Sequence, residues 1–304
     1  MRGKTGFTLV ELAVVLAILG VLGSAMGALF MRQQRFYRGA SEMLYAREGV
    51  RDAMEVLAID LRGVSVMDTV RLLADSAIEV FAPIGGSLVC QVVAGYDVGL
   101  PAVSALDNTL TWFLLQPDTG DLALFYRGDV ANVGRWERHR ITGFAPRPLS
   151  STCPASSGLA HDEDVVAGGQ GFQVSLEAPL SNAVVPGAPV RFIRRGRYSL
   201  YRASDGDWYL GYRRCNAIGS SVCGAIQPLS GPYRSYSSNP RSSGLLFEYF
   251  DSRGVRLDAS SPLDLARIDV SARAESRHHL GVEGRAFTPS DSATLSIAIR
   301  NRPT

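Results

Sequence analysis

Residues 12–31 form a run of twenty amino acids without a charged side chain, and this run constrains the chain more than any other feature. As a helix rising about 1.5 Å per residue, such a run can cross the hydrocarbon core of a bilayer, which is about 30 Å thick. Two cations, Arg2 and Lys4, precede it without an acidic neighbour. By the positive-inside rule, they hold the N-terminus in the cytoplasm and direct the remaining chain across the membrane.

A single carboxylate, Glu11, stands at the start of this apolar run. A charged side chain at the centre of a bilayer costs about 3 kcal/mol even on the lenient insertion scale. Such a group is therefore normally excluded from lipid or given a partner. Because Glu11 lies near one end of the run, a cation from another subunit could reach it.

The sequence GFTLVE, from Gly6 to Glu11, followed by a long apolar run, resembles the class III signal of type IV prepilins and type II secretion pseudopilins. The resemblance implies that a prepilin peptidase cuts between Gly6 and Phe7 and methylates the new N-terminal amine of Phe7. It also implies that Glu11, at the fifth mature position, pairs with the N-terminal amine of a neighbouring pilin during assembly.

Two other interpretations of the N-terminus are open. An ordinary secretory signal would be cleaved near Gly27, but its apolar region is typically about 7–15 residues long and does not favour a carboxylate such as Glu11. A plain signal anchor would tether an unrelated domain, and it would not require Gly6, Phe7 and Glu11 together. Both interpretations fit the sequence less well than a prepilin signal.

The remaining sequence predicts an α+β fold, in which a long N-terminal helix packs on a large β-rich head of antiparallel strands. The chain has 304 residues and a formal net charge of +2, so no global field favours nucleic acid or acidic lipid. The predicted parts are a leader (1–6), a transmembrane and filament-core helix (7–31), its amphipathic continuation (32–62), a first β-rich part (63–146), a loop (147–171) and a second β-rich part (172–304).

Apolar residues recur at steps of three and four beyond the membrane segment, which predicts that the helix continues to about residue 62 with one buried stripe. Arg47 is the one break in the series. The stripe consists of Phe36, Ala40, Met43, Val50, Met54, Leu57 and Leu61.

From residue 78 the pattern changes to short runs rich in β-branched and aromatic residues, at 78–81, 88–93, 109–115 and 122–126. Pro117, Asp118 and Gly120 predict a hairpin between the last two runs. Asp118 and Asp121 could attract calcium, although an Asp-rich turn is far more often only a turn.

Later segments predict a hairpin of residues 189–202 and 207–214 around Asp205 and Gly206, and another within 244–258 around Asp251 and Gly254. Residues 265–276 and 293–302 predict two final strands.

Residues 147–171 are rich in Pro, Ser and Gly and predict a loop. This loop could divide two β subdomains or form an insertion at the edge of one sheet. Its acidic cluster, Asp162, Glu163 and Asp164, lacks the spacing of a calcium loop and is interpreted as solvated surface.

Four cysteines lie beyond the membrane segment, where an oxidising compartment and an even count favour disulfides. Sequence alone permits three pairings. The short Gly- and Ser-containing loop favours Cys215 with Cys223, which leaves Cys90 with Cys153. Zinc is the competing interpretation, but there is no C-x-x-C pair to support it.

The hairpin at 189–214 interleaves cations with aromatic rings, a composition that could bind the backbone and bases of DNA. The favoured alternative is that strand alternation directs the aromatics inward and the arginines outward. The residues are Arg191, Arg194, Arg195, Arg197, Arg202, Arg213, Arg214, Phe192, Tyr198, Tyr201, Trp208, Tyr209 and Tyr212.

No pattern indicates an enzyme, a resident metal or a cofactor. His139, His161, His278 and His279 occur in no metal-binding spacing, and neither a G-x-S-x-G elbow nor a P-loop is present. The chain is therefore expected to be non-catalytic.

The second half loosely resembles PilW-type minor pilins and J-type pseudopilins. The resemblance rests on RYSLYRASDGDWYLGYRR, on F-x-Y-F-D-x-x-G at Phe247 to Gly254, and on a final strand ending in Arg-Asn. It implies a minor type IV pilin that primes or caps a filament, with an adhesion or DNA-uptake role. The alternatives are a J-type pseudopilin of type II secretion and a membrane-anchored binding protein unrelated to filaments.

This resemblance also implies partners and a location. The partners are other pilins or pseudopilins, reached through the N-terminal helix, together with the prepilin peptidase, the inner-membrane assembly platform and, before assembly, membrane lipid. The chain would cross the inner membrane once, with a cytoplasmic N-terminus and an extracytoplasmic head, before entering a filament.

Overall fold

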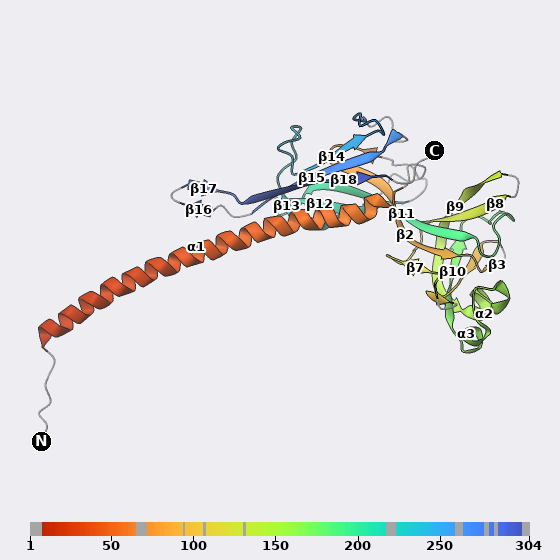
Figure 1. The fold of residues 1–304 in the computed structure, drawn as a ribbon, viewed down its shortest axis with the longest axis horizontal. Helices are drawn as coiled ribbons and strands as arrows, with labels where there is room; N and C mark the ends of the chain where they lie inside the picture. The colour runs from red at the N-terminus through yellow and green to blue at the C-terminus, as the bar shows by residue number, and fades with distance from the viewer. Residues whose placement is uncertain are drawn as a thin grey trace, which may run out of the picture.

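The structure of the protein is a computed structural model in which one long helix carries a β-rich head (Figure 1). This architecture confirms the predicted α+β fold. The structure describes residues 8–64, 72–93, 95–105, 108–129, 132–216, 223–258, 264–276, 280–282 and 285–299. Six residues named above lie outside this set: Arg2, Lys4, Gly6, Phe7, His278 and His279.

Helix α1 spans Leu9–Arg62, 54 residues, and curves gently along its length (Figure 1). A helix of this length is about 80 Å long at about 1.5 Å per residue. It ends at Gly63, whose backbone N–H donates to the carbonyl of Leu61. The predicted continuous rod is therefore confirmed.

Only the C-terminal part of α1 is buried by the head, and its contact stripe differs from the predicted one. The buried positions are Ala46, Gly49, Val50, Ala53, Leu57 and Leu61. Phe36 and Met43, predicted to belong to the stripe, are 73% and 41% exposed. The prediction was wrong there because helical spacing marks an apolar face without saying which part of it the sheet reaches.

The strands of the described residues pair antiparallel, and 14 of them form one sheet, whereas β5 with β6 and β16 with β17 form two separate two-stranded sheets. The strands are β1 (Leu72–Leu73), β2 (Ala77–Leu88), β3 (Gln91–Val93), β4 (Asp97–Leu100), β5 (Ser104–Ala105), β6 (Asn108–Thr109), β7 (Trp112–Phe113), β8 (Leu122–Asp129), β9 (Asn132–Pro148), β10 (Gln170–Leu176), β11 (Pro189–Arg202), β12 (Trp208–Arg214), β13 (Gln227–Tyr233), β14 (Leu245–Phe250), β15 (Arg267–Glu275), β16 (Leu280–Val282), β17 (Arg285–Phe287) and β18 (Ser290–Ala298).

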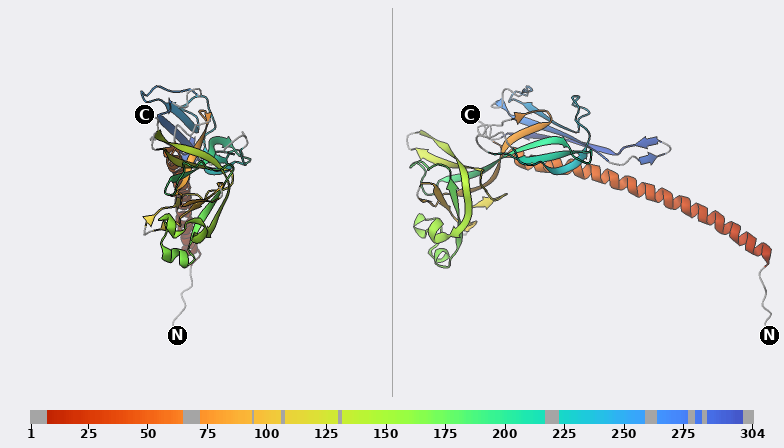
Figure 2. Two further views of the ribbon diagram at one scale, coloured as in Figure 1. Left: turned by 90° about the vertical axis from the view of Figure 1, so that its right-hand side faces the viewer. Right: turned by 180° about the vertical axis from the view of Figure 1, so that it is seen from behind.

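The sheet is arranged in two parts, which the views of Figures 1 and 2 separate clearly. The proximal sheet, comprising β12–β15 and β18, lies along the C-terminal half of α1. The distal lobe, comprising β3, β4 and β7–β10, lies beyond the C-terminal end of α1. Strands β2 and β11 run through both parts, paired from Ala77 with Ser199 to Leu88 with Pro189.

Each part has its own hydrophobic core. The proximal core joins Leu57 and Leu61 of α1 to residues of the sheet such as Phe247 and Val270. The distal core contains Phe125, Ile141 and Phe192, among others. Because β2 and β11 contribute to both cores, the two parts are held in one continuous sheet.

The strand predictions were partly right. Strands β11 and β12 form the predicted hairpin, with Arg202 opposite Trp208, and β15 and β18 are the two predicted final strands. After β14, the predicted second strand is reduced to a single bridge between Phe250 and Arg256.

The predicted hairpin of residues 109–126 was wrong. Its first arm, β7, pairs with Gly85 and Gly86 of β2, and its second arm, β8, pairs with β9 and β11. Phe113 explains the difference, because its ring packs edge-on against Phe144 and Phe172, at centroid distances of 5.4 and 5.3 Å. This long-range aromatic contact holds β7 against β2 rather than against its neighbour in the chain.

Residues 147–171 are not wholly a loop, as was predicted. They contain α2 (Leu149–Thr152), a 3-10 helix (Ala155–Ser157) and α3 (Asp162–Val166), the last beginning at the acidic cluster, which is exposed. The segment joins β9 to β10, which pair directly. It is therefore an insertion between neighbouring strands of one sheet.

Candidate assembly helix and its anchorage

The first turn of α1 is closed by a reciprocal pair of hydrogen bonds between Thr8 and Glu11. The Glu11 carboxylate accepts from the Thr8 backbone N–H at 3.0 Å and from the Thr8 hydroxyl at 2.9 Å. In return, the Thr8 Oγ1 accepts from the Glu11 N–H at 3.3 Å. This capping box satisfies N–H groups that a helix start otherwise leaves unpaired.

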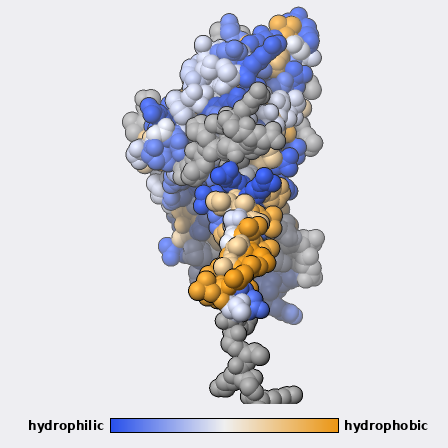
Figure 3. Space-filling model, turned by 90° about the vertical axis from the view of Figure 1, so that its left-hand side faces the viewer, coloured by the Kyte–Doolittle hydropathy of each residue, from blue (hydrophilic) through white to orange (hydrophobic). Residues whose placement is uncertain are grey.

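Among the described residues, the apolar half of α1 makes no buried contact with the rest of the chain. Its residues 9–31 are all exposed, and α1 is long and apolar enough to cross a membrane. Figure 3 shows the hydrophobic side chains gathered on this half of the helix, below a largely hydrophilic head. Burying this surface in lipid or against other helices is strongly favourable, at about 25 cal/mol per Å².

Three glycines, Gly20, Gly23 and Gly27, lie within the apolar half of α1. A Cβ added at any of them would meet nothing within 4 Å. The head therefore does not fill the space beside these three glycines. In membranes, small residues at such positions allow helix backbones to approach closely.

The opposite half of α1 is anchored to the head by polar contacts as well as by its apolar stripe. The hydroxyl of Tyr233 donates to the helix carbonyl of Gly49 at 2.6 Å. The hydroxyl of Tyr198 donates to the carboxylate of Asp60. Burial raises the pKa of Asp60, an effect that the bond from Tyr198 partly opposes. The head is thus fixed to the helix at more than one turn.

Two disulfides stabilise the head, and they have the pairing favoured by the sequence. Cys90 bonds to Cys153 and attaches α2 to the end of β2. Cys215 bonds to Cys223 after β12. Both bonds agree with the extracytoplasmic location expected for the head.

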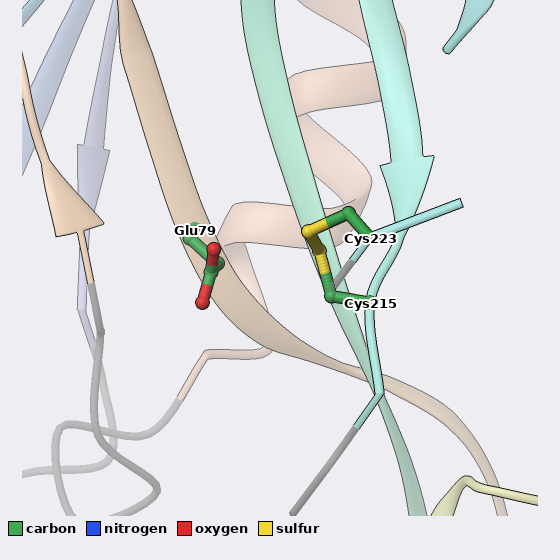
Figure 4. A group of neighbouring side chains, drawn as sticks. All are labelled: Glu79, Cys215 and Cys223. Atoms are coloured by element: carbon green, nitrogen blue, oxygen red, sulfur yellow. A yellow bond between two sulfur atoms is a disulfide. The ribbon is translucent and has the colours of Figure 1, made fainter. Parts of the chain in front are cut away.

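Glu79 of β2 lies beside the Cys215–Cys223 disulfide (Figure 4). The three side chains are close enough to suggest a metal site, but the sulfurs bond to each other and are not thiolates. The Glu79 carboxylate accepts instead from Arg195 Nε at 2.7 Å and from Arg197 Nη2 at 2.7 Å. The group is an ion-paired cluster.

Several arginines of the arginine-rich hairpin at 189–214 form ion pairs within the head. Arg195 is only 5% exposed, so the prediction that the arginines point outward was wrong for this residue. Arg194 and Arg214 both pair with Asp121, at 2.7 and 3.1 Å. Sequence reasoning missed these pairs because the acids lie more than 70 positions away in the chain.

The same pairs occupy the turn for which calcium was considered. Arg214 donates to Asp118 at 2.8 Å, and this bond is the main reason that the pKa of Asp118 is lowered. Asp121 is almost fully buried under two guanidinium groups. Cations of the chain itself therefore neutralise both carboxylates.

Comparison with known proteins identifies the N-terminus. Residues 1–27 match the family described as the prokaryotic N-terminal methylation motif. No curated protein and no solved structure matches the chain. The matched range contains Gly6, Phe7 and Glu11, and it supports a type IV pilin-like or pseudopilin protein, processed by the prepilin peptidase and assembled with other pilins.

Proposed function

We propose that this chain is a minor pilin of a type IV pilus, placed at the filament tip, where it primes or caps assembly. The observation that carries the proposal is the unburied apolar half of α1, which carries Glu11 in its first turn, inside the methylation motif. Before assembly this half lies in the inner membrane, and afterwards it packs among the helices of other pilins. The role is structural and involves no catalysis.

The position of the distal lobe supports a terminal place. The lobe lies beyond the C-terminal end of α1, at the opposite end of the helix from Leu9 (Figures 1 and 2). In a filament of parallel, staggered helices, the space beyond the C-terminal end of α1 is occupied by the neighbouring subunit on the outward side. A lobe there would obstruct such a subunit, so the tip accommodates it best.

An adhesive role for the head follows from the same position, since a tip subunit meets surfaces first. DNA is a weaker candidate ligand of the arginine-rich hairpin. Arg194, Arg195, Arg197 and Arg214 already pair with carboxylates, which reduces the charge that this hairpin offers to phosphates.

The copy number of the chain in sheared, purified filaments tests the proposal. Quantitative mass spectrometry should find a few copies per filament at most, whatever the filament length, and gold-labelled antibody should mark ends. A Glu11→Ala variant provides the control for specific incorporation. Copy number that grows in proportion to filament length would contradict a tip position.

A further inference from the structure

A cleft of about 630 Å³ lies where the distal lobe meets the end of α1. Its lining includes Gly63 at the helix end, Gly86 of β2 and Trp112 of β7. It also includes Arg191 of β11 and Leu124 of β8. The cleft is separate from the apolar half of α1 and from the ion-paired cluster around Glu79.

The sheet register places the principal groups of the cleft in one row. Trp112 is opposite Gly86, Gly86 is opposite Arg191, and Arg191 is opposite Leu124. Directly opposed residues of antiparallel strands project to the same face. The indole ring of Trp112, the backbone of Gly86 and the guanidinium of Arg191 are therefore on the same face of the sheet.

Trp112 is held in place by the segment around it. The buried hydroxyl of Thr111 donates to the carbonyl of Pro101 at 3.0 Å and bonds to the Ser87 hydroxyl at 2.7 Å. The next side chain along β7, Phe113, packs into the distal core. Because strand side chains alternate, Trp112 must project from the opposite face.

The indole of Trp112 lies against the backbone of Gly86, where an added Cβ would be 2.9 Å from its Nε1. Glycine at position 86 therefore leaves room for the ring. The side chain of Trp112 is nevertheless 45% exposed, so a large aromatic surface is left open to a ligand.

Arg191 supplies the charged group. Its guanidinium lies 4.8 Å from the ring centroid of Trp136, and stacking of this kind orients the planar fork. Among the residues that the structure describes, no carboxylate pairs with Arg191. Its N–H groups are suited to bind a carboxylate in the bidentate manner.

The surrounding charge narrows the class of ligand. Residues 84–193 contain six arginines, no lysine and ten carboxylates, and of these carboxylates Asp118 and Asp121 pair with Arg194 and Arg214, so the lobe keeps only a small excess of negative charge. A nucleic acid, with a phosphate on every nucleotide, needs a run of cations and would be repelled. A ligand with a single carboxylate on a mostly neutral framework can pair with Arg191 and meets no such penalty, and Arg138, opposite Leu124 in the same row, adds a second cation nearby.

We propose that this cleft binds a largely neutral glycan that carries one acidic sugar. The flat C–H face of a pyranose ring can pack on the exposed indole of Trp112, and the acidic sugar can place its carboxylate on Arg191. The inference extends the adhesive part of the proposed function. It is measured on the purified chain without a filament, so its failure would leave the filament proposal intact.

Titration calorimetry of the full-length chain tests this, in a detergent without a sugar headgroup. The ligands are 3′-sialyllactose and a cello-oligosaccharide with one terminal glucuronate, each compared with its neutral parent. We expect saturable binding of at least one acidic glycan, at least tenfold tighter than its parent. Arg191→Ala should remove that advantage, and Trp112→Ala should weaken acidic and neutral ligands alike by at least tenfold.

Two variants serve as controls, because each lies in the distal lobe but does not line the cleft: Arg147→Ala, an exposed cation, and Leu115→Ala, an exposed apolar residue close to Trp112. Both should bind like the wild type. The inference is overturned if neither acidic glycan binds, or if Trp112→Ala and Arg191→Ala bind like the controls. Tighter binding of a 20-nucleotide oligo-dT would also overturn it, in favour of nucleic acid.

Discussion

Thr8 and Glu11 cap the start of α1 by exchanging hydrogen bonds, so the Glu11 carboxylate is satisfied within its own chain before any neighbour is present. The carboxylate accepts two bonds from Thr8, at 3.0 and 2.9 Å. Charged acceptors of this kind are stabilised near a helix N-terminus. An isolated subunit can therefore hold this charge at the edge of the membrane until a partner amine replaces the local donors.

Replacing Glu11 by alanine should prevent incorporation without affecting membrane insertion. The variant lacks the charge that would attract the N-terminal amine of a neighbour. Its apolar run inserts into lipid at least as well as that of the wild type, because it carries no charged side chain. We expect at least tenfold less of the chain in sheared filaments, with normal amounts in the membrane fraction, measured by immunoblotting.

Thr8→Ala is the matched control for Glu11→Ala, because it weakens the same cap but keeps the carboxylate. The loss of an N-cap side chain costs about 1 kcal/mol. Incorporation of Thr8→Ala should therefore stay within a few-fold of the wild type. Equal losses in the two variants would mean that the cap, and not the charge of Glu11, is what assembly requires.

Removing Glu79 should strongly destabilise the head. Glu79 is 1% exposed and Arg195 is 5% exposed, so either charge is costly without the other. Glu79→Leu removes the carboxylate that balances the buried charge of Arg195, and we expect a loss of about 3–5 kcal/mol in the free energy of unfolding. Denaturant unfolding of the full-length chain in detergent measures it.

The double variant Glu79→Leu with Arg195→Met separates a lost pair from a lost charge. It removes both buried charges and should recover part of the stability that Glu79→Leu loses. If the double variant is less stable than Glu79→Leu by the full cost of Arg195→Met alone, the two side chains are not coupled and the interpretation fails.

The two disulfides should differ in their effect on stability. Cys90 and Cys153 are 63 positions apart, and Cys215 and Cys223 are 8 apart. The chain-entropy model assigns about 4 kcal/mol to the longer loop and about 2.5 kcal/mol to the shorter one. Unfolding of the two Cys→Ser pairs should show the larger loss for the Cys90–Cys153 variant; the reverse order would contradict this assignment.

Asp60 should make stability depend on pH. Burial raises its pKa in the folded chain, so the folded state binds this proton more tightly than the unfolded state does. Its contribution to stability is then complete below the unfolded pKa of about 3.9 and is lost as the pH rises through the folded value. Asp60→Asn does not titrate, so it should gain stability relative to the wild type as the pH rises.

Tyr198→Phe also tests the pH dependence that Asp60 causes, because Tyr198 is the hydrogen-bond donor to its carboxylate. The bond from Tyr198 lowers the pKa of Asp60, so removing it should raise that pKa further and steepen the loss of stability with pH. Unfolding free energies measured at several pH values would show the effect. Parallel pH profiles for the wild type, Asp60→Asn and Tyr198→Phe would contradict it.

Local patterns in the sequence predicted the elements whose causes are local. The uncharged run and the 3.6-residue period predicted α1, and turn residues such as Asp205 and Gly206 predicted the β11–β12 hairpin. The Thr8-x-x-Glu11 spacing of a capping box was also present and could have been recognised. The favoured pairing of Cys215 with Cys223 followed from the shortness of the loop between them.

Contacts between distant segments could not be predicted in the same way. The place of β7 depends on Phe113 meeting Phe144 and Phe172, which no period or turn reveals. The burial of Arg195 depends on Glu79, 116 positions earlier. Phe36 was assigned to the stripe that packs on the head because its spacing is helical, although only the extent of the sheet decides which turns of α1 are covered.

The mature N-terminus tests the central claim most directly. Mass spectrometry of the chain purified from envelopes, with and without the prepilin peptidase, should find an N-methylated Phe7 as the first residue only when the peptidase is present. A chain that begins at Met1, or near Ala28, in both strains would contradict the pilin-like account, and the head would then belong to a tethered or secreted protein.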